Sequence, residues 1–150
     1  MIRVCSAYRV NRTVSAAAIQ VLASIPPIDL LSYERHYNFG ADQLAKKLNR
    51  ECLINKWQER WNKAEVGRWT WSLIPDLKVC CDRTHEELSF YLTQAFSGHG
   101  NFSSYLYKIG KREDESCVWC KVPDTAEHTI FICTKWVEER AWAEEQVGQV

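Results

Sequence analysis

The chain has 150 residues, and its 19 Lys and Arg are balanced by 19 Asp and Glu, so the formal net charge is zero. Apolar residues make up 46% and charged residues 25%, which excludes a disordered, collagen-like or multi-spanning membrane chain. With 6 Gly and 4 Pro the chain is poor in turn residues, and this favours a mainly α fold. Seven Trp indicate a core of large rings, an exposed aromatic surface, or both.

The charge is unevenly distributed along the chain. Residues 1–75 hold 11 Lys and Arg against 6 Asp and Glu, whereas residues 76–150 hold 8 against 13. The basic half could favour an anionic partner such as nucleic acid, although a surplus of this size more often makes a solvated face.

The first helix is predicted from Val14 to Ile25, where apolar residues recur at helical spacing before Pro26-Pro27. Three arginines precede this stretch, as they would in a targeting peptide. Gln20 and Ser24 interrupt the apolar run, so we favour a helix over a targeting peptide. No segment reaches about 18 apolar residues, and we therefore expect no membrane span.

A second helical stretch begins near Ile28 and pauses at residues 38–40, and a long helix is predicted from Ala41 to Ala64. Trp57 and Trp61 lie four residues apart in it, which indicates a core stripe rather than a base-stacking platform. Gly67 can end this helix.

The next elements are short. Trp69, Trp71 and Leu73 alternate with polar residues, which predicts a short extended segment at Trp69–Leu73. Thr84 and Glu87 form a possible capping box for a helix that continues to Phe96. Further helices are predicted at residues 101–110 and 134–147, with a charged linker at 111–116 between them.

Seven cysteines form no even framework, which argues against a disulfide scaffold. Cys5 and Cys52 stand alone and are expected to be buried as small apolar residues. Cys80 and Cys81 are adjacent, which is poor geometry for binding one metal together, and their residue types alone do not indicate a cysteine-dependent enzyme.

The remaining cysteines form a C-x2-C-x7-H-x4-C motif of Cys117, Cys120, His128 and Cys133. Three cysteines and one histidine are a common closed ligand set for structural zinc, which leaves no position for catalytic water. The alternative is three reduced buried cysteines and a chance histidine. Five residues turn an α-helix through about 500°, so any helix at His128 has to end or unwind before Cys133.

The sequence therefore predicts a helical connector region at residues 1–110 and a zinc-binding tail with a terminal helix at 111–150. Weaker candidates for nucleic-acid binding are basic and aromatic residues: Arg68, Trp69, Lys108, Lys111, Arg112 and Trp119. Each has a structural alternative, such as an arginine stem that covers a tryptophan, or Trp119 as a lid on the metal site. The chain has no P-loop, G-x-S-x-G or H-E-x-x-H motif and no paired polymerase aspartates, so we expect no enzyme activity from it alone.

Several stretches, in order, resemble the region after the polymerase core in LINE-type (non-LTR) retrotransposon polyproteins of arthropods. They are Arg3–Arg9, Thr13–Ser15, Ile25–Ile28, Trp57-Gln58, Trp61, Gly67–Thr70, Leu73–Leu77, Phe90–Gln94, Ser97–Gly100, Phe102, Tyr105-Leu106 and the Cys/His motif itself. The resemblance covers roughly residues 3–140.

This resemblance implies a C-terminal piece of a reverse transcriptase polyprotein, whose upstream part would carry an endonuclease and an RNA-directed DNA polymerase. The piece would bind zinc, help to hold element RNA or target DNA, and act in the nucleus or cytoplasm within a retrotransposon complex. The alternative is a host protein-interaction module with structural zinc and no nucleic-acid binding.

Overall fold

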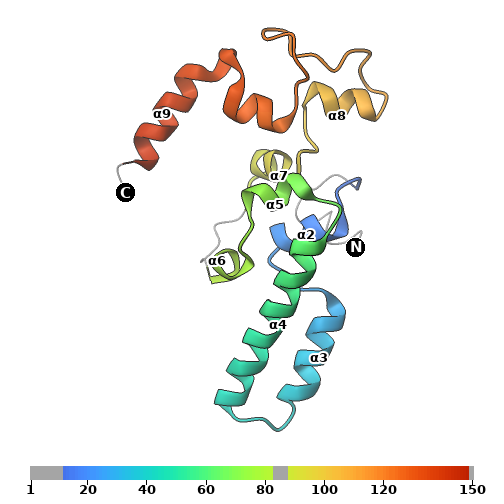
Figure 1. Ribbon diagram of the computed structural model, residues 1–150, viewed down its shortest axis with the longest axis vertical. Coiled ribbons are helices and arrows are strands. Elements are labelled where there is room, and N and C mark those ends of the chain that lie inside the picture. Colours follow the sequence, from blue (N-terminus) through green and yellow to red (C-terminus); the bar gives the residue numbers. More distant parts are fainter. Residues whose placement is uncertain (1–11, 83–87, 149–150) are drawn as a thin grey trace. The chain divides into compact units, whose positions relative to one another are not determined.

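The computed structural model describes residues 12–82 and 88–148. The chain divides into two compact units, residues 1–97 and 98–150, which are described separately. Helices dominate both units (Figure 1), and within the described ranges the extended pairing is one isolated antiparallel bridge, between Ser116 and Pro123. The predicted mainly α class is confirmed, whereas the functional division at residues 110 and 111 stays a prediction.

The helices of the first unit are α2 (Ala16–Leu22), α3 (Ile28–Asn38), α4 (Gln43–Lys63), α5 (Arg68–Leu73), α6 (Leu77–Asp82) and α7 (Phe90–Ser97). Those of the second unit are α8 (Ser103–Lys108), a π turn (His128–Ile132), a 3-10 turn (Thr134–Trp136) and α9 (Val137–Val147).

Local hydrogen bonds explain where the first helices begin. The Ser15 hydroxyl accepts from the Ala18 amide at 3.3 Å and caps α2, and the Asp42 carboxylate accepts from the Ala45 amide at 2.8 Å and caps α4. Gly40 lies between α3 and α4 with a φ of +72°, which favours glycine. The two helices therefore run back along each other as a hairpin (Figure 1).

The core of the first unit forms where α2, α4 and α6 meet. Trp57 and Trp61 are each 2% exposed, which confirms the core stripe. The Trp61 ring N–H donates to the Ile74 carbonyl at 2.8 Å, so the only polar atom of this buried ring has a partner. Burial of the two rings thus holds the loop before α6 against α4.

Two predictions for this unit are wrong. Residues Trp69–Leu73 form α5 and not an extended segment, because Gly67 begins the turn at a φ of +74° and the Trp71 amide donates to its carbonyl at 2.9 Å. Cys52 is exposed, because it lines an open pocket between α3 and α4 and is not covered by side chains of α3. Cys5 and the capping box of Thr84 and Glu87 lie outside the described residues.

Among the residues that the structure describes, no helix combines the length and the apolar character that crossing a bilayer requires.

Gly67 and Gly40 offer a matched test of this packing. A Cβ on Gly67 would lie 2.9 Å from the Ser15 hydroxyl and 3.2 Å from the Ala18 Cβ, whereas one on Gly40 would meet no atom within 4 Å. Both have positive φ, so each alanine costs roughly 1–2 kcal/mol of backbone strain. We expect Gly67→Ala to lower the free energy of unfolding by about 1 kcal/mol more than Gly40→Ala, because it also displaces the α2 cap. Urea denaturation followed by near-UV circular dichroism measures the difference, and equal losses would contradict this packing.

Candidate metal centre

Cys117 and Cys120 lie on a tight turn, or knuckle, in the second unit. The Lys121 amide donates to the Cys117 carbonyl at 3.0 Å, and the Cys117 amide donates to the Val122 carbonyl at 2.7 Å. Lys121 has a φ of +59°, which reverses the chain directly after the second cysteine. The turn therefore brings both sulfur atoms to one side of the loop.

His128 is the first residue of the π turn, and Cys133 is the C-cap that follows its last residue. The Cys133 amide donates to the His128 carbonyl at 2.7 Å, the i to i+5 bond that defines a π turn. In an α-helix these two residues would point about 140° apart, and the wider turn brings them closer to one face. The backbone becomes extended at Cys133, with φ −55° and ψ 127°. The predicted unwinding between the two residues is confirmed.

The four side chains converge. Their ligand atoms all lie within 4.8 Å of one another. The Cys133 sulfur is 3.7 Å from that of Cys117 and 3.8 Å from that of Cys120. Two sulfurs of a zinc tetrahedron with Zn–S bonds of about 2.3 Å lie roughly 3.8 Å apart. The spacing of these sulfurs therefore fits a shared tetrahedral ion.

The histidine also fits a metal ligand. His128 is buried, and its Nε2 atom has no hydrogen-bond partner among the described residues. A buried ring nitrogen without a partner is costly, and coordination to a cation would satisfy it. Thiolate and imidazole donors in this ratio suit zinc. The residues could thus hold one zinc ion.

Thr134 supports the site from outside the ligand set. Its amide donates to the Cys120 sulfur at 3.4 Å, and its hydroxyl lies 3.3 Å from the same atom. These hydrogen bonds lower the pKa of the Cys120 thiol, while burial raises the pKa of Cys133. Hydrogen bonds of this kind orient a ligand and tune its charge.

Asp124 is the polar centre of the second unit. One carboxylate oxygen accepts from the Ser103 amide at 3.0 Å and from its hydroxyl at 2.7 Å, and the other accepts from the Thr129 hydroxyl at 2.6 Å. The Ser103 hydroxyl also accepts from Arg112. Asp124 thereby joins the start of α8 to the π turn that carries His128.

Asp124 and Thr134 were not predicted from the sequence. One signal for the turn was present in the motif, because Thr125 stands three residues before His128. Its hydroxyl accepts from the His128 amide at 3.0 Å, as a helix cap does. Thr134 had no comparable signal.

The candidate nucleic-acid residues of the first unit are engaged in its packing. The Trp69 ring N–H donates to the Ala95 carbonyl at 2.7 Å. Arg68 donates to the Asn62 and Ala64 carbonyls at the end of α4 and lies 4.1 Å from the centre of the Trp71 ring. The structure therefore brings Arg68 onto Trp71, and a role of Arg68 and Trp69 with nucleic acid stays a prediction.

The candidates of the second unit face solvent. Lys108 and Lys111 are exposed at the end of α8, and Arg112 is exposed apart from its bond to Ser103. Trp119, between the two knuckle cysteines, is 57% exposed. All four are accessible to a partner, and their role also stays a prediction.

Comparison with known proteins gives a consistent set of relatives. The chain is 28% identical to a 115 kDa protein of the type-1 retrotransposable element R1DM of Drosophila melanogaster, over 87% of the chain and 15% of that protein. It is 30% identical to a Pol polyprotein of an R1 element of Nasonia vitripennis, over 75% of the chain and 40% of the relative. A second Nasonia vitripennis R1 polyprotein is 28% identical over 85% of the chain and 36% of its own length.

Homologues of this chain are thus Pol polyproteins of type-1 non-LTR retrotransposable elements. The resemblance to LINE-type polyproteins is confirmed. The chain spans less than half the length of each of these relatives. No protein-family profile and no solved structure matches it.

Asp124 gives the second unit a testable pH dependence. Burial acts to raise the pKa of this carboxyl, but hydrogen bonds from Thr129 and Ser103 outweigh it and lower the pKa below the usual 3.8. A carboxylate with a lowered pKa stabilises the fold above its unfolded pKa, and this contribution disappears as the pH falls through the folded pKa.

We expect Asp124→Asn to destabilise residues 98–148 by about 1–3 kcal/mol at neutral pH, because an amide cannot accept all three hydrogen bonds. The difference from the unsubstituted chain should shrink below about pH 4. Amide hydrogen exchange of this unit measures the difference in stability between the two chains. A difference that stays constant down to pH 3 would contradict the role of the carboxylate.

Proposed function

We propose that the chain is the zinc-binding and nucleic-acid-binding C-terminal part of a non-LTR retrotransposon reverse transcriptase polyprotein. The observation that carries the proposal is the convergence of Cys117, Cys120, His128 and Cys133 at zinc-like spacing. It occurs in a chain whose relatives are retrotransposon Pol polyproteins.

Zinc would serve a structural role in this unit. The three thiolates and the imidazole of the Cys3His set fill a tetrahedron, so no position would be left for a reacting water. Bound zinc would supply charge neutralisation for the thiolates and fold the knuckle onto the π turn. In finger peptides such binding is worth about 10–16 kcal/mol in apparent terms.

The parent polyprotein would be an RNA-directed DNA polymerase that also carries an endonuclease. The present part would contribute contacts to element RNA or target DNA within a retrotransposon complex in the nucleus or cytoplasm. Lys108, Lys111 and Arg112 would contact phosphates, and Trp119 would stack on a base. Arg68 and Trp69 are weaker candidates because packing already engages them.

One observation favours a different function for the tail. Helix α9 carries Glu138, Glu139, Glu144 and Glu145 and leaves Trp142 64% exposed. An acidic helix with an exposed ring suits a protein partner better than a phosphate backbone. A host interaction module with structural zinc is therefore the second candidate function.

Zinc content is the first test. The purified chain should contain one equivalent of zinc, and Cys117→Ser/Cys120→Ser should contain none, because two of four ligands are lost. Cys80→Ser/Cys81→Ser is the matched control and should retain the metal. Elemental analysis under reducing conditions decides, and a folded, reduced chain without zinc would overturn the metal site.

Salt dependence of binding separates the two candidate functions. Each phosphate contact made by a lysine or arginine releases counterions, so affinity for single-stranded nucleic acid should fall with a log–log slope of about −0.7 per contact. We expect a slope steeper than about −2 for the zinc-loaded chain, measured by fluorescence anisotropy. An absence of binding at low salt would favour the protein-interaction module.

A further inference from the structure

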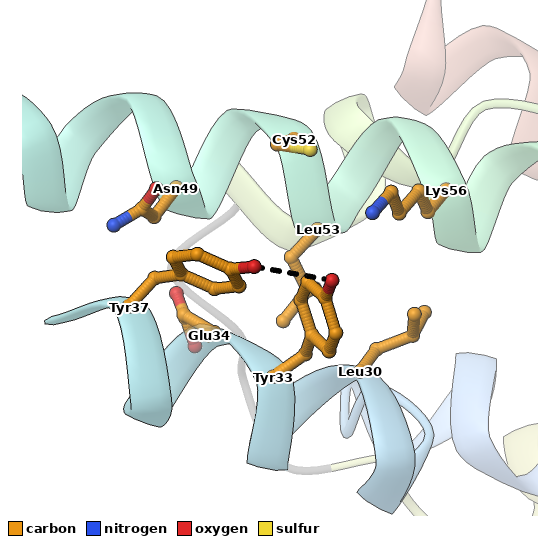
Figure 2. Close-up of a pocket in the computed structure, with 8 residues that line it drawn as sticks. All are labelled: Leu30, Tyr33, Glu34, Tyr37, Asn49, Cys52, Leu53 and Lys56. Carbon is orange, nitrogen blue, oxygen red and sulfur yellow. Dashed lines mark hydrogen bonds between the residues drawn. The ribbon is translucent and has the colours of Figure 1, made fainter.

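A pocket of about 330 Å³ opens between α3 and α4 in the first unit, far along the sequence from the metal centre. Its floor is apolar and is made by Leu30 and Leu53, which are both buried. Figure 2 shows the rings of Tyr33 and Tyr37 on the α3 side, with Lys56 and three further residues on α4: Asn49, Cys52 and Leu53. A volume of this size falls at the lower end of small-ligand sites.

The two tyrosines form a preassembled aromatic wall. Their ring centres lie 4.8 Å apart, and the Tyr37 hydroxyl donates to the Tyr33 hydroxyl at 3.2 Å. This bond raises the pKa of Tyr37, so the hydroxyl stays neutral at physiological pH. The rings are nevertheless 55% and 52% exposed. Large rings held in place but left open to solvent are suited to stacking on a flat ligand.

One cationic side chain, Lys56, and one carboxylate, Glu34, line the same pocket. The Lys56 ammonium lies 4.9 Å from the centre of the Tyr33 ring, and Arg50 pairs with Glu34 at 3.1 Å. Lys56 is also one turn before Arg60, whose ion pair with Asp29 lies further along the hairpin. The aromatic wall therefore has a positively charged group directly beside it.

Helix α4 as a whole is basic. It carries six lysines and arginines against two glutamates. Two of its cations pair with carboxylates of α3, and the other four are exposed lysines: Lys46, Lys47, Lys56 and Lys63. Lys56 beside the rings is complementary to a phosphate next to a stacked base, and the excess of lysines on α4 adds to the attraction of an anionic chain.

We propose that the pocket between α3 and α4 binds single-stranded nucleic acid, with one base stacked on one ring of the Tyr33–Tyr37 pair, whose planes are tilted by 46°, and the adjacent phosphate at Lys56. The site rests on the proposed nucleic-acid function and deepens it, because it moves the principal contact into the first unit. A base and its sugar fit the volume. The Asn49 side chain, whose amide donates to Asn38 at 2.9 Å, lies at the pocket where the polar edge of a base would end.

The test uses the full zinc-loaded chain and fluorescent oligo-U and oligo-dT of about 12 nucleotides, a length typical of single-strand sites. Tyr33→Leu/Tyr37→Leu should weaken binding at least about fivefold, because stacking is lost while helix propensity is kept. Tyr33→Phe/Tyr37→Phe should bind within about twofold of the unsubstituted chain. A preference between the two oligonucleotides identifies RNA or DNA as the source of the base and phosphate.

Matched controls lie in the same unit. Tyr91 on α7 is 80% exposed, and Tyr91→Leu should leave the affinity unchanged. Lys56→Gln should reduce the salt slope by about 0.7, whereas Lys78→Gln on α6 should not.

The outcomes separate this site from the proposed function. If the unsubstituted chain binds and the leucine pair behaves like Tyr91→Leu, the pocket is overturned while nucleic-acid binding stands. If the unsubstituted chain does not bind either oligonucleotide at low salt, both are overturned. Equal weakening by the leucine and phenylalanine pairs would overturn stacking, since the rings remain in the phenylalanine pair.

Discussion

The second unit depends on the side chains of its candidate metal centre, because its described residues bury little else. Within residues 98–148 the buried apolar side chains are those of Cys117, Ala126 and Cys133, and no Leu, Ile, Val, Phe, Tyr or Trp side chain in this range is buried. A unit of this size cannot gain enough free energy from such a core to offset its chain entropy. Small domains of this kind are stabilised by a disulfide or a metal instead. The cysteines of the second unit are the three of the Cys3His set, and all three are free.

That constraint explains why the polar bonds of the unit are arranged as they are. Asp124 joins α8 to the π turn, and Arg140 at the start of α9 donates to the Cys133 carbonyl at 2.7 Å. The Asp124 bond reaches the π turn that carries His128, and the Arg140 bond reaches the backbone of Cys133. Hydrogen bonds therefore connect α8 and α9 to the candidate metal centre, whereas the helices of the first unit pack on Trp57 and Trp61. The two units are stabilised by different physical means.

Sequence reasoning found what depends on local chemistry. The start of α3 after Pro26-Pro27 and the chain reversals at Gly40 and Gly110 follow from the backbone preferences of proline and glycine, whereas α2 ends at Leu22, before the predicted stop at the prolines. The convergence of the Cys/His motif follows from its ligand spacing, and the unwinding at His128 follows from helix geometry alone. These features needed no knowledge of tertiary contacts.

Sequence reasoning failed where tertiary contacts decide. Five residues are too few to distinguish a period of 2 from one of 3.6, so the alternation of Trp69, Trp71 and Leu73 could not reveal a helix. The contacts that favour α5 are long-range, since Trp69 and Thr70 bond to carbonyls of α7. Cys52 follows the apolar spacing of α4, but the facing side chains on α3 are the tilted tyrosines, which leave a pocket. The pocket between α3 and α4 could therefore not be predicted from the sequence of either helix alone, because both helices line it.

The distribution of charge differs between the helices of the two units, which bears on the proposed nucleic-acid binding. Helix α4 has a surplus of four cations, whereas α9 has four glutamates and one arginine. Phosphates are attracted to the first and repelled by the second at distances within a Debye length of about 8–10 Å. Three of the five exposed cations of the second unit lie in a short run, 108–112, and three acidic residues follow them directly; the other two, Lys121 and Lys135, stand apart. Under the proposed function, a polynucleotide would thus gain most of its electrostatic attraction from α4, and the second unit would contribute position and stacking more than charge.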